Sequence, residues 1–317
     1  MIKITKEAPR DRFGKVLVEL AAKNRDVIAM DCDLGRSTRS YQINQVDKER
    51  FLEMGIAEQN MISTAAGLAH EGKIVFVNSF AVFLTGRGFD QIRQQLALPK
   101  MNVKICGSSA GITQGCDGAT HQSVVDVALM RALPNMTVIV PADGPQTEAA
   151  VKYAYSYNGP VYLRLSRYEI ENVFPENSNE NLLDVQEIKE GGETAIISCG
   201  PVLRNALGAA EKLDKKGILT GVVNVPVIKP LDRDAIIKAA LKYRALFVVE
   251  EHSMYGGLSS AVAEVLAEIK DSPKAWMKSL GLKDRFGESG TAEELLKEHC
   301  LDPEGIVKEI VIALEAE

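Results

Sequence analysis

One glutamate opens a predicted helix whose following residues are almost all small or apolar. After Glu58 come Gln59 and Asn60, and then Met-Ile-Ser-Thr-Ala-Ala-Gly-Leu-Ala. A carboxylate is electrostatically favoured in a first helical turn, so its position alone is explained by the helix start. The alternative is a buried carboxylate that shares a proton with a ligand nitrogen. Glu53 and Glu58 bracket an otherwise apolar Met-Gly-Ile-Ala, which favours the second interpretation.

Two phenylalanines, Phe80 and Phe83, lie three residues apart where a predicted strand turns into a helix. Their spacing alone fits two residues of a hydrophobic core. The carboxyl ends of strands are also where α/β sheets bind ligands. A phenylalanine at such a point can stack on a flat heterocycle. Both interpretations stay open on spacing alone.

A glycine-rich segment, 107–122, follows a predicted strand and carries polar side chains before any helix begins. It holds four glycines and ends in Asp117-Gly-Ala-Thr-His121-Gln. Ordering such a permissive loop costs conformational entropy, and a polar loop of this kind is therefore typical of a functional segment. Asp117 could simply form a local turn with the next glycine, and His121 could be an ordinary loop histidine. The clustering of these residues favours a binding or catalytic loop.

Four further residues could bind an anion. Arg164 and Arg167 end the predicted strand 160–166 on the same edge, and arginine suits bidentate binding of phosphate or carboxylate. The alternative is that they neutralise neighbouring glutamates. Arg10 and Ser37 lie before the first helix and after the first strand, and they carry little information alone.

Apolar, β-branched runs alternate with amphipathic stretches and would position these residues. Strands are predicted at 26–31, 73–79, 102–107, 136–142 and 160–166, and helices at 10–23, 58–71, 87–98, 124–131 and 145–157. Later strands are predicted at 194–200, 218–230 and 245–252, and helices at 201–216, 232–242 and 257–269. Apolar strands separated by helices predict parallel sheets covered on both faces. We therefore expect two consecutive three-layer α/β domains, 1–168 and 190–317, joined by a polar linker at 169–189.

The composition is that of an ordinary globular protein and excludes several classes of function. Of 317 residues, 46% are hydrophobic and 25% are charged, with a formal net charge of −6. Mild acidity argues against nucleic acid or an anionic membrane as a partner. The longest uncharged stretch, 74–86, is too short to span a bilayer, and the first residues contain no apolar signal core. We expect a cytoplasmic protein whose five cysteines are free thiols.

Several signature motifs of other enzyme classes do not occur in the sequence. It contains no GxxxxGK[ST] loop, no HExxH and no Cys/His cluster with metal-ligand spacing. We therefore expect no metal site built from this chain.

The informative segments together resemble one family. GIAEQN before a helix of small residues, SFAVFLTGRGFDQIR, AGITQGCDGATHQ and GPVYLRLSR occur in the order seen in the transketolase family. The first half of the chain resembles its pyrimidine-binding domain, which has the thiamine-diphosphate-binding fold, and residues 190–317 resemble its C-terminal domain. The resemblance implies an enzyme that transfers a two-carbon ketol unit from a ketose to an aldose.

The resemblance also implies a cofactor, thiamine diphosphate, and the residues that contact it. Glu58 matches the glutamate beside N1′ of the aminopyrimidine. Phe83 matches the aromatic residue that stacks on this ring, and Phe80 lines the same pocket. The cofactor carries the electrons of the broken carbon–carbon bond, while the protein supplies position and proton transfer.

The implied substrate contacts come from the polar loop and the arginines. Asp117 and His121 match residues that bind hydroxyls of the donor sugar, and His121 is expected to assist proton transfer. Arg167 matches a phosphate-binding arginine, with Arg164 beside it. Arg10 and Ser37 align with further phosphate contacts of the family.

Full-length transketolases resemble this chain only in their second half. Their first half carries a Gly-Asp-Gly motif that binds Mg²⁺ and the diphosphate, and no Gly-Asp-Gly occurs here. The resemblance therefore implies the C-terminal subunit of a split transketolase. An N-terminal partner subunit would supply the diphosphate-binding domain and Mg²⁺, in an α2β2 assembly.

Two departures leave the substrate open. Ser109 stands where common transketolases have a histidine, and Ala110 stands where deoxyxylulose-phosphate synthases have an arginine. Gly-Ile-Ala-Glu58 itself is like the motif of those synthases. A phosphorylated sugar is the default substrate, and a sulfonated sugar is the alternative.

Other interpretations are a subunit of a deoxyxylulose-phosphate synthase or 2-oxo acid dehydrogenase, or a non-catalytic scaffold subunit. The intact sugar loop favours transketolase.

Overall fold

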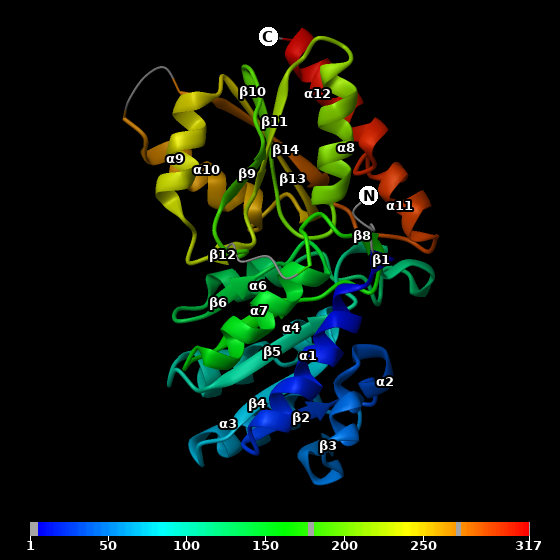
Figure 1. The fold of residues 1–317 in the computed structure, drawn as a ribbon, viewed down its shortest axis with the longest axis vertical. Coiled ribbons are helices and arrows are strands. Elements are labelled where there is room, and N and C mark those ends of the chain that lie inside the picture. Colours follow the sequence, from blue (N-terminus) through cyan, green and yellow to red (C-terminus); the bar gives the residue numbers. More distant parts are fainter. Residues whose placement is uncertain (1–5, 177–180, 271–273, 317) are drawn as a thin grey trace.

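Two β-sheets, one in each half of the chain, organise the structure (Figure 1). The computed structural model describes residues 6–176, 181–270 and 274–316. The two α/β units lie end to end, with the first residues of α1 and the end of the first sheet at their junction (Figure 1). The predicted class, two α/β domains in tandem, is confirmed.

The first sheet has seven strands in the order β12-β6-β7-β5-β4-β2-β3. Its strands are β2 (Val27–Asp31), β3 (Phe51–Glu53), β4 (Ile74–Phe80), β5 (Val103–Ser108), β6 (Thr137–Ile139), β7 (Val161–Arg164) and β12 (Val227–Lys229). Every pairing is parallel except that of β12 with β6. The central strands are apolar and buried, as expected for a parallel sheet covered on both faces.

Helices cover both faces of this sheet. They are α1 (Pro9–Lys23), α2 (Gly35–Thr38), α3 (Glu58–His70), α4 (Ala81–Arg87), α5 (Phe89–Gln91), α6 (Asp126–Ala132) and α7 (Gly144–Ser156). α1 and α7 pack together over one face, while α3, α4 and α6 bury their apolar residues against the other. The carboxyl ends of β4 and β5 therefore point toward the second half of the chain (Figure 1).

The second sheet has five strands in the order β14-β13-β10-β11-β9. They are β9 (Gln186–Lys189), β10 (Thr194–Ser198), β11 (Thr220–Asn224), β13 (Ala245–Ser253) and β14 (Trp276–Leu282). The helices are α8 (Leu203–Asp214), α9 (Arg233–Lys242), α10 (Leu258–Glu268), α11 (Ala292–Glu298) and α12 (Pro303–Glu315). α8 and α12 pack together over one face, and α9 and α10 cover the other.

The predicted strand 218–230 is in fact two strands that belong to different sheets. β11 lies in the second sheet, whereas β12 pairs antiparallel with β6 of the first. Pro226 separates them, since proline lacks the N–H that an uninterrupted central strand needs. Its carbonyl instead accepts a hydrogen bond from Val140 N–H at 2.8 Å. Residues 227–229 thus join the two halves of the chain.

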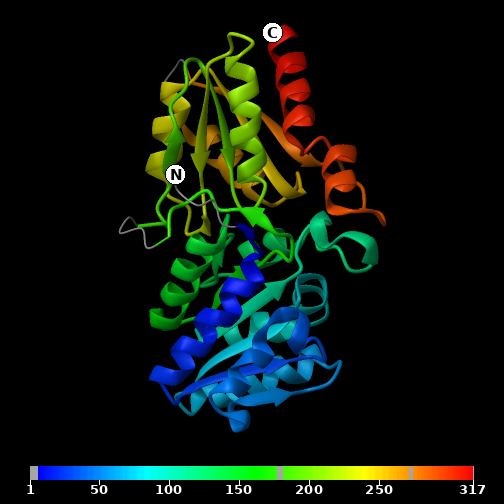
Figure 2. The same cartoon turned by 45° about the vertical axis from the view of Figure 1, so that its right-hand side comes forward.

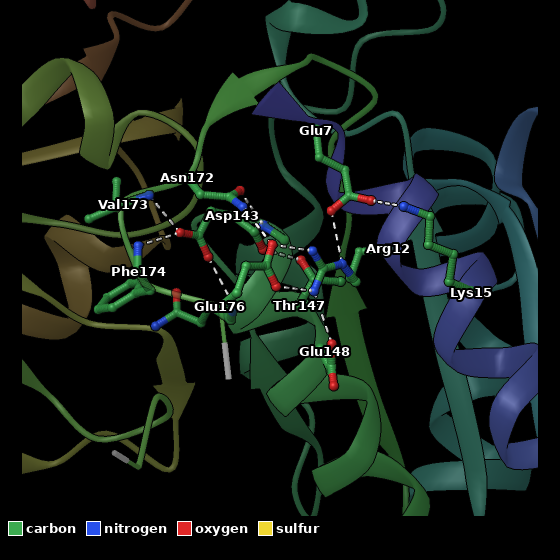
Figure 3. Close-up of polar contacts among 12 residues, drawn as sticks. Glu7, Arg12, Lys15, Asp143, Thr147, Glu148, Asn172, Val173, Phe174 and Glu176 are labelled. Atoms are coloured by element: carbon green, nitrogen blue, oxygen red, sulfur yellow. Dashed lines mark hydrogen bonds and ion pairs between the residues drawn. The ribbon is translucent and has the colours of Figure 1, made fainter. Parts of the chain in front are cut away.

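The polar segment 169–189, expected to be a linker, contains two short strands. β8 (Ile170–Glu171) pairs with β1 (Lys6–Glu7), and β9 forms the edge of the second sheet. The backbone N–H groups of Val173 and Phe174 donate to Asp143 at 2.7 and 2.8 Å (Figure 3). Residues 177–180 of this segment lie outside the described part.

A network around Arg12 fastens the same segment to the first domain. Arg12 makes ion pairs with Glu7, Glu148 and Glu176, so one side chain of α1 joins β1, α7 and the start of the predicted linker (Figure 3). Hydrogen bonds and charges from these glutamates raise the pKa of Arg12, despite its partial burial. The described part of the linker is therefore bound to the folded surface.

The helix predicted at 87–98 begins earlier, directly after β4. α4 starts at Ala81, α5 follows Gly88, and a π-helical turn spans Ile92–Ala97. Gly86 and Gly88 hide this helix in the sequence, because glycine is a poor helix former. Phe80 is consequently the last residue of β4, and Phe83 lies in the first turn of α4.

Among the described residues, no helix is both long and apolar enough to cross a membrane. The five cysteines are free.

Candidate functional site

The Glu58 carboxylate is buried at the start of α3. Its side chain is 4% exposed, as expected for a carboxylate enclosed by protein. Arg87 Nη1, at the end of α4, donates to its two oxygens at 3.1 and 3.3 Å. Ser79 Oγ, near the end of β4, lies 3.4 Å from Oε1. The first turn of the helix and the end of the strand therefore place the Glu58 carboxyl group at the carboxyl edge of the sheet.

Three rings form a cluster that Arg87 joins to this carboxylate, because Arg87 Cζ lies 4.1 Å from the centre of the Phe83 ring. Phe80 and Phe83 are stacked, with ring centres 6.0 Å apart and an interplanar angle of 18°. His121 stands edge-on to both rings, 5.1 Å from Phe83 and 6.3 Å from Phe80. Thr120 Oγ1 lies 3.0 Å from His121 Nδ1, which fixes the ring orientation. The structure thus brings four residues selected from the sequence, Glu58, Phe80, Phe83 and His121, into one group.

Asp117, in the glycine-rich loop, and Arg167, which follows β7, form a second group. Arg167 Nη1 lies 3.2 Å from Asp117 Oδ2 and 3.3 Å from Gln114 Oε1. Gln114 Nε2 also donates to Asp117 Oδ2, at 2.5 Å. The Asp117 and Arg167 side chains are 44% and 38% exposed, so a ligand can reach both.

Arg10 lies close to this second group. Its Nη1 donates to the Ser37 carbonyl oxygen at 3.1 Å, and its backbone N–H donates to the carbonyl of Ser166. Burial and the charges of Arg39 and Arg167 lower the pKa of Arg10, and its buried Nε has no hydrogen-bond partner within the described chain. An anion placed here would satisfy that N–H and offset the repulsion between the arginines.

Asp31 shapes the loop that carries Ser37. At the end of β2, this buried carboxylate accepts hydrogen bonds from Leu34 N–H at 2.7 Å, Thr38 Oγ1 at 2.6 Å and Ser40 Oγ at 2.8 Å. Burial raises the pKa of Asp31 to about 6, although these hydrogen bonds act in the opposite direction.

Arg164 makes its hydrogen bonds to residues outside both groups, although the sequence suggested that it shares an edge with Arg167. It is the last residue of β7, 5% exposed, and its Nε donates to Asp126 Oδ2 at 2.8 Å. Its Nη2 donates to the carbonyl oxygens of Ser123 and Glu251 at 3.2 and 3.0 Å. Burial alone would raise the pKa of Asp126, but the Arg164 charge holds it below its ordinary value. Arg164 is therefore enclosed where the two domains meet.

Glu251, in β13, reaches the glycine-rich loop from the C-terminal domain. It is buried, and its Oε1 accepts a hydrogen bond from Thr113 N–H at 2.6 Å. Burial raises the pKa of Glu251, while Arg164 and Thr113 act against that rise. Gly111, with φ +82°, would place any Cβ 2.2 Å from Glu251 Oε1, so this approach requires glycine.

A second contact from the C-terminal domain holds the far end of the loop. Gln122 Nε2 donates to the carbonyl oxygen of Glu288 at 2.8 Å, and α11 packs against residues 112–117. Figure 2 shows this loop directly below α11. Both ends of the loop are thus fixed by the second half of the chain.

The sequence reasoning missed Arg87, Ser79, Gln114 and Glu251. Glu251 had a usable signal, because two adjacent glutamates in an otherwise apolar strand are unusual. No signal in the sequence indicated Arg87, because an arginine between two glycines is typical of a surface turn. Across the described ranges 6–176, 181–270 and 274–316, no group of three or more His, Cys, Asp or Glu residues gathers as metal ligands.

Family models match nearly the whole chain. Residues 6–172 match the transketolase pyrimidine-binding domain, and residues 184–306 match the transketolase C-terminal domain. The chain belongs to the transketolase family.

Several transketolase sections and subunits align with this chain over nearly their whole length. It is 42% identical to a transketolase C-terminal section of Methanocaldococcus jannaschii, with 97% of this chain and 96% of that protein covered. It is 38% identical to a 6-deoxy-6-sulfo-D-fructose transketolase subunit of a Clostridium species, covering 97% and 94%. A solved split-gene transketolase, described as an inactive β4 tetramer, superposes with a TM-score of 0.88 at 42% identity, covering 97% and 98%. By contrast, the chain spans 49% of the human transketolase.

Proposed function

We propose that this chain is the C-terminal subunit of a heteromeric, thiamine-diphosphate-dependent transketolase. It would move a two-carbon ketol unit from a ketose to an aldose. One observation carries the proposal: Arg87 joins the buried Glu58 carboxylate to the Phe83 ring, which stacks on Phe80 and has His121 at its edge. A transketolase needs a proton-holding carboxylate, an aromatic surface and a polar group near the reacting carbon at one place.

The residues present fit the aminopyrimidine end of thiamine diphosphate. The flat ring needs an aromatic face and a carboxylate in its plane, and Phe83 and Glu58 supply these. Phe83 is partly exposed, whereas Phe80 is buried. When bound, the cofactor supplies the electron sink for breaking and making the carbon–carbon bond. Glu58 would hold the proton at N1′, and the phenylalanines would fix the ring.

The polar loop and the arginines would bind the sugar. His121 donates and Asp117 accepts hydrogen bonds with hydroxyls of the donor. Arg167 and Arg10 would bind an anionic group at the far end of the substrate, with Ser37 beside Arg10. A phosphate or a sulfonate would satisfy the partnerless Nε of Arg10. Arg164 is assigned instead to holding the domains together, because its donors bind Asp126 and two backbone carbonyls.

A partner subunit would complete the active site. This chain spans about half of a full-length transketolase, and its relatives of equal length are named sections or subunits. The partner would carry the diphosphate-binding domain with Mg²⁺, and two copies of each chain would give an α2β2 assembly with two sites. The inactive β4 assembly of the similar split-gene protein supports the expectation that the chain alone associates with itself and lacks activity.

The test is co-expression with the N-terminal partner, followed by titration with thiamine diphosphate and Mg²⁺. We expect the complex to bind the cofactor and to transfer a ketol unit from phosphorylated or sulfonated ketoses to aldoses, whereas either chain alone does not. Robust transfer of a ketol unit by this chain alone would refute the proposal that the active site is divided between two subunits. Turnover of pyruvate instead of a ketose would favour a synthase or oxo acid dehydrogenase. A complex that binds no cofactor would refute the enzyme assignment.

A further inference from the structure

The Arg87 guanidinium contacts the two groups that the proposed function assigns to the aminopyrimidine. Its Nη1 donates to both oxygens of Glu58, at 3.1 and 3.3 Å. Its Cζ lies 4.1 Å from the centre of the Phe83 ring. One side chain of the chain itself therefore engages both the carboxylate and the aromatic face.

A guanidinium and a protonated aminopyrimidine have the same recognition features. Each is flat and positively charged, donates N–H groups from its edge and stacks through its face on an aromatic ring. Each can therefore pair with a carboxylate while covering a phenylalanine. Glu58 and Phe83 cannot hold both groups in one place, so one of the two must leave when the other binds.

We propose that Arg87 is an internal substitute for the aminopyrimidine ring of the cofactor. It neutralises Glu58 and covers Phe83 until thiamine diphosphate arrives, and it then swings out toward solvent. This inference rests on the proposed function for the identity of the incoming ring. It adds a residue that competes with the cofactor for its site.

The position of Arg87 allows this movement. It is the last residue of α4, and its side chain is 48% exposed, against 4% for Glu58. Gln59 Nε2 donates to the Arg87 carbonyl oxygen at 3.1 Å, which holds the backbone in place. Gly88 follows, and any Cβ there would lie 2.2 Å from Ile62 Cδ1 of α3. The helix end is thus fixed against α3, and only the side chain has to move.

The competition sets the size of the expected effect. A ligand that binds only when Arg87 is displaced shows an apparent affinity reduced by the displaced fraction. A half-exposed ion pair and a cation–π contact together correspond to about a five- to thirty-fold change in such an equilibrium. Removing the guanidinium should therefore tighten cofactor binding by about this factor.

The experiment measures binding of thiamine diphosphate with Mg²⁺ to the complex by calorimetry, and its association rate by stopped-flow fluorescence. The variants are Arg87→Met, which keeps the length of the stem, and Arg87→Lys, which keeps the charge but loses the flat face. The matched control is Arg93→Met, since Arg93 lies in the same segment and pairs with exposed Asp90. The unfolding temperature of each chain without its partner is recorded as a second readout.

We expect Arg87→Met to tighten the Kd about five- to thirty-fold or to raise the association rate by that factor. Its unfolding temperature as a single chain should fall, because Glu58 loses its partner. Arg87→Lys should shift the Kd in the same direction by less, and Arg93→Met should leave it unchanged. If Arg87→Met bound the cofactor more weakly than the wild type, or equally well, this inference would be overturned. The proposed function would stand, because the wild type binds normally. A wild-type complex that binds no cofactor would overturn the proposed function and this inference together.

Discussion

The carboxylate of Glu251 accepts a hydrogen bond from the backbone N–H of Thr113 at 2.6 Å, across the boundary between the two domains. The C-terminal domain therefore holds the start of the loop that carries Asp117 and His121. Gln122 is held at the other end of the loop by the carbonyl of Glu288. A domain that offers none of the proposed cofactor contacts thus controls the geometry of the proposed sugar site.

Replacing Glu251 should disturb the sugar site while leaving the cofactor site formed. Glu251→Ala leaves a buried N–H without a partner, which costs about 1–3 kcal/mol. We expect a lower unfolding free energy and a donor kcat/KM reduced about ten-fold, with an unchanged Kd for thiamine diphosphate. Glu251→Gln keeps an acceptor and should lose less, and Glu268→Ala, at an exposed ion pair of α10, is the control. Loss of cofactor binding in Glu251→Ala would contradict this role.

Glu58→Gln should reduce turnover by the assembled enzyme at least about 100-fold. Glutamine has nearly the same size but cannot hold a proton at N1′ in the way a carboxylate does, and positioned proton-transfer groups contribute at least this factor. The check is the steady-state kcat of the co-expressed complex saturated with cofactor. Glu53→Gln, near the same loop but exposed, provides the comparison. Near-wild-type kcat in Glu58→Gln would remove Glu58 from the mechanism.

His121→Ala and Asp117→Ala should weaken use of the donor sugar. Loss of a hydrogen bond that involves a charged group costs roughly 1.5–3 kcal/mol, which corresponds to about a 10- to 150-fold lower kcat/KM. The measurement is donor kinetics at saturating acceptor, together with a cofactor titration. Cofactor binding should change little because Glu58 and Phe83 remain. If the variants lost the cofactor but kept normal donor kinetics, the loop would be a cofactor clamp.

Arg164 and Arg167 form a matched pair for separating a structural role from a substrate role. Arg164→Met leaves the buried Asp126 without its charge partner, so the unfolding free energy should fall by about 3–5 kcal/mol. Arg167→Met removes a partly exposed side chain, so stability should hardly change while the KM of an anionic sugar rises. Urea titration and kinetics with anionic and neutral acceptors measure the two effects. A stable Arg164→Met with a raised KM would restore Arg164 to the substrate site.

Asp31 should make the stability of the chain depend on pH. Its pKa is about 6 in the folded chain against an ordinary 3.8, so the folded state keeps the proton longer than the unfolded state. The stabilisation is complete below about pH 4 and is lost as the pH rises through 6, by about 3 kcal/mol. Asp31→Asn keeps an oxygen for Leu34 N–H. It should abolish the part of the stability loss at rising pH that comes from Asp31. Urea titrations between pH 4 and 7 would give the free energy of unfolding of both proteins. If Asp31 had no such role, this free energy would change with pH equally in the two.

Much of the fold could be predicted because its signals are local. The buried strands β2, β4, β5, β10 and β13 each lie within a few residues of a predicted apolar run. β12 could not be placed, because its pairing with β6 depends on a contact between distant segments rather than on its own residues. The start of α4 was missed because packing overrides the low helix propensity of Gly86.

The candidate site was predictable in its residue types and only partly in its contacts. Glu58 and Phe83 stood out by their positions at helix and strand ends, and His121 by its place in a glycine-rich loop. The structure brings Phe83 and His121 together, and Arg87 joins Glu58 to Phe83. Their partners Arg87 and Glu251 were invisible, since a side chain that reaches back from a helix end or across a domain boundary leaves no pattern of spacing.

The three residues of β12 have a consequence for the independence of the two halves. They form the end strand of the first sheet and cover the hydrogen-bonding edge of the neighbouring strand, β6. If the chain were cut after residue 172, that edge would be bare, and a bare strand edge is a template for adding strands from other molecules. The pyrimidine-binding half is therefore a poor candidate for a transplantable module. Its solubility is expected to depend on a short piece of chain that lies more than fifty residues farther along.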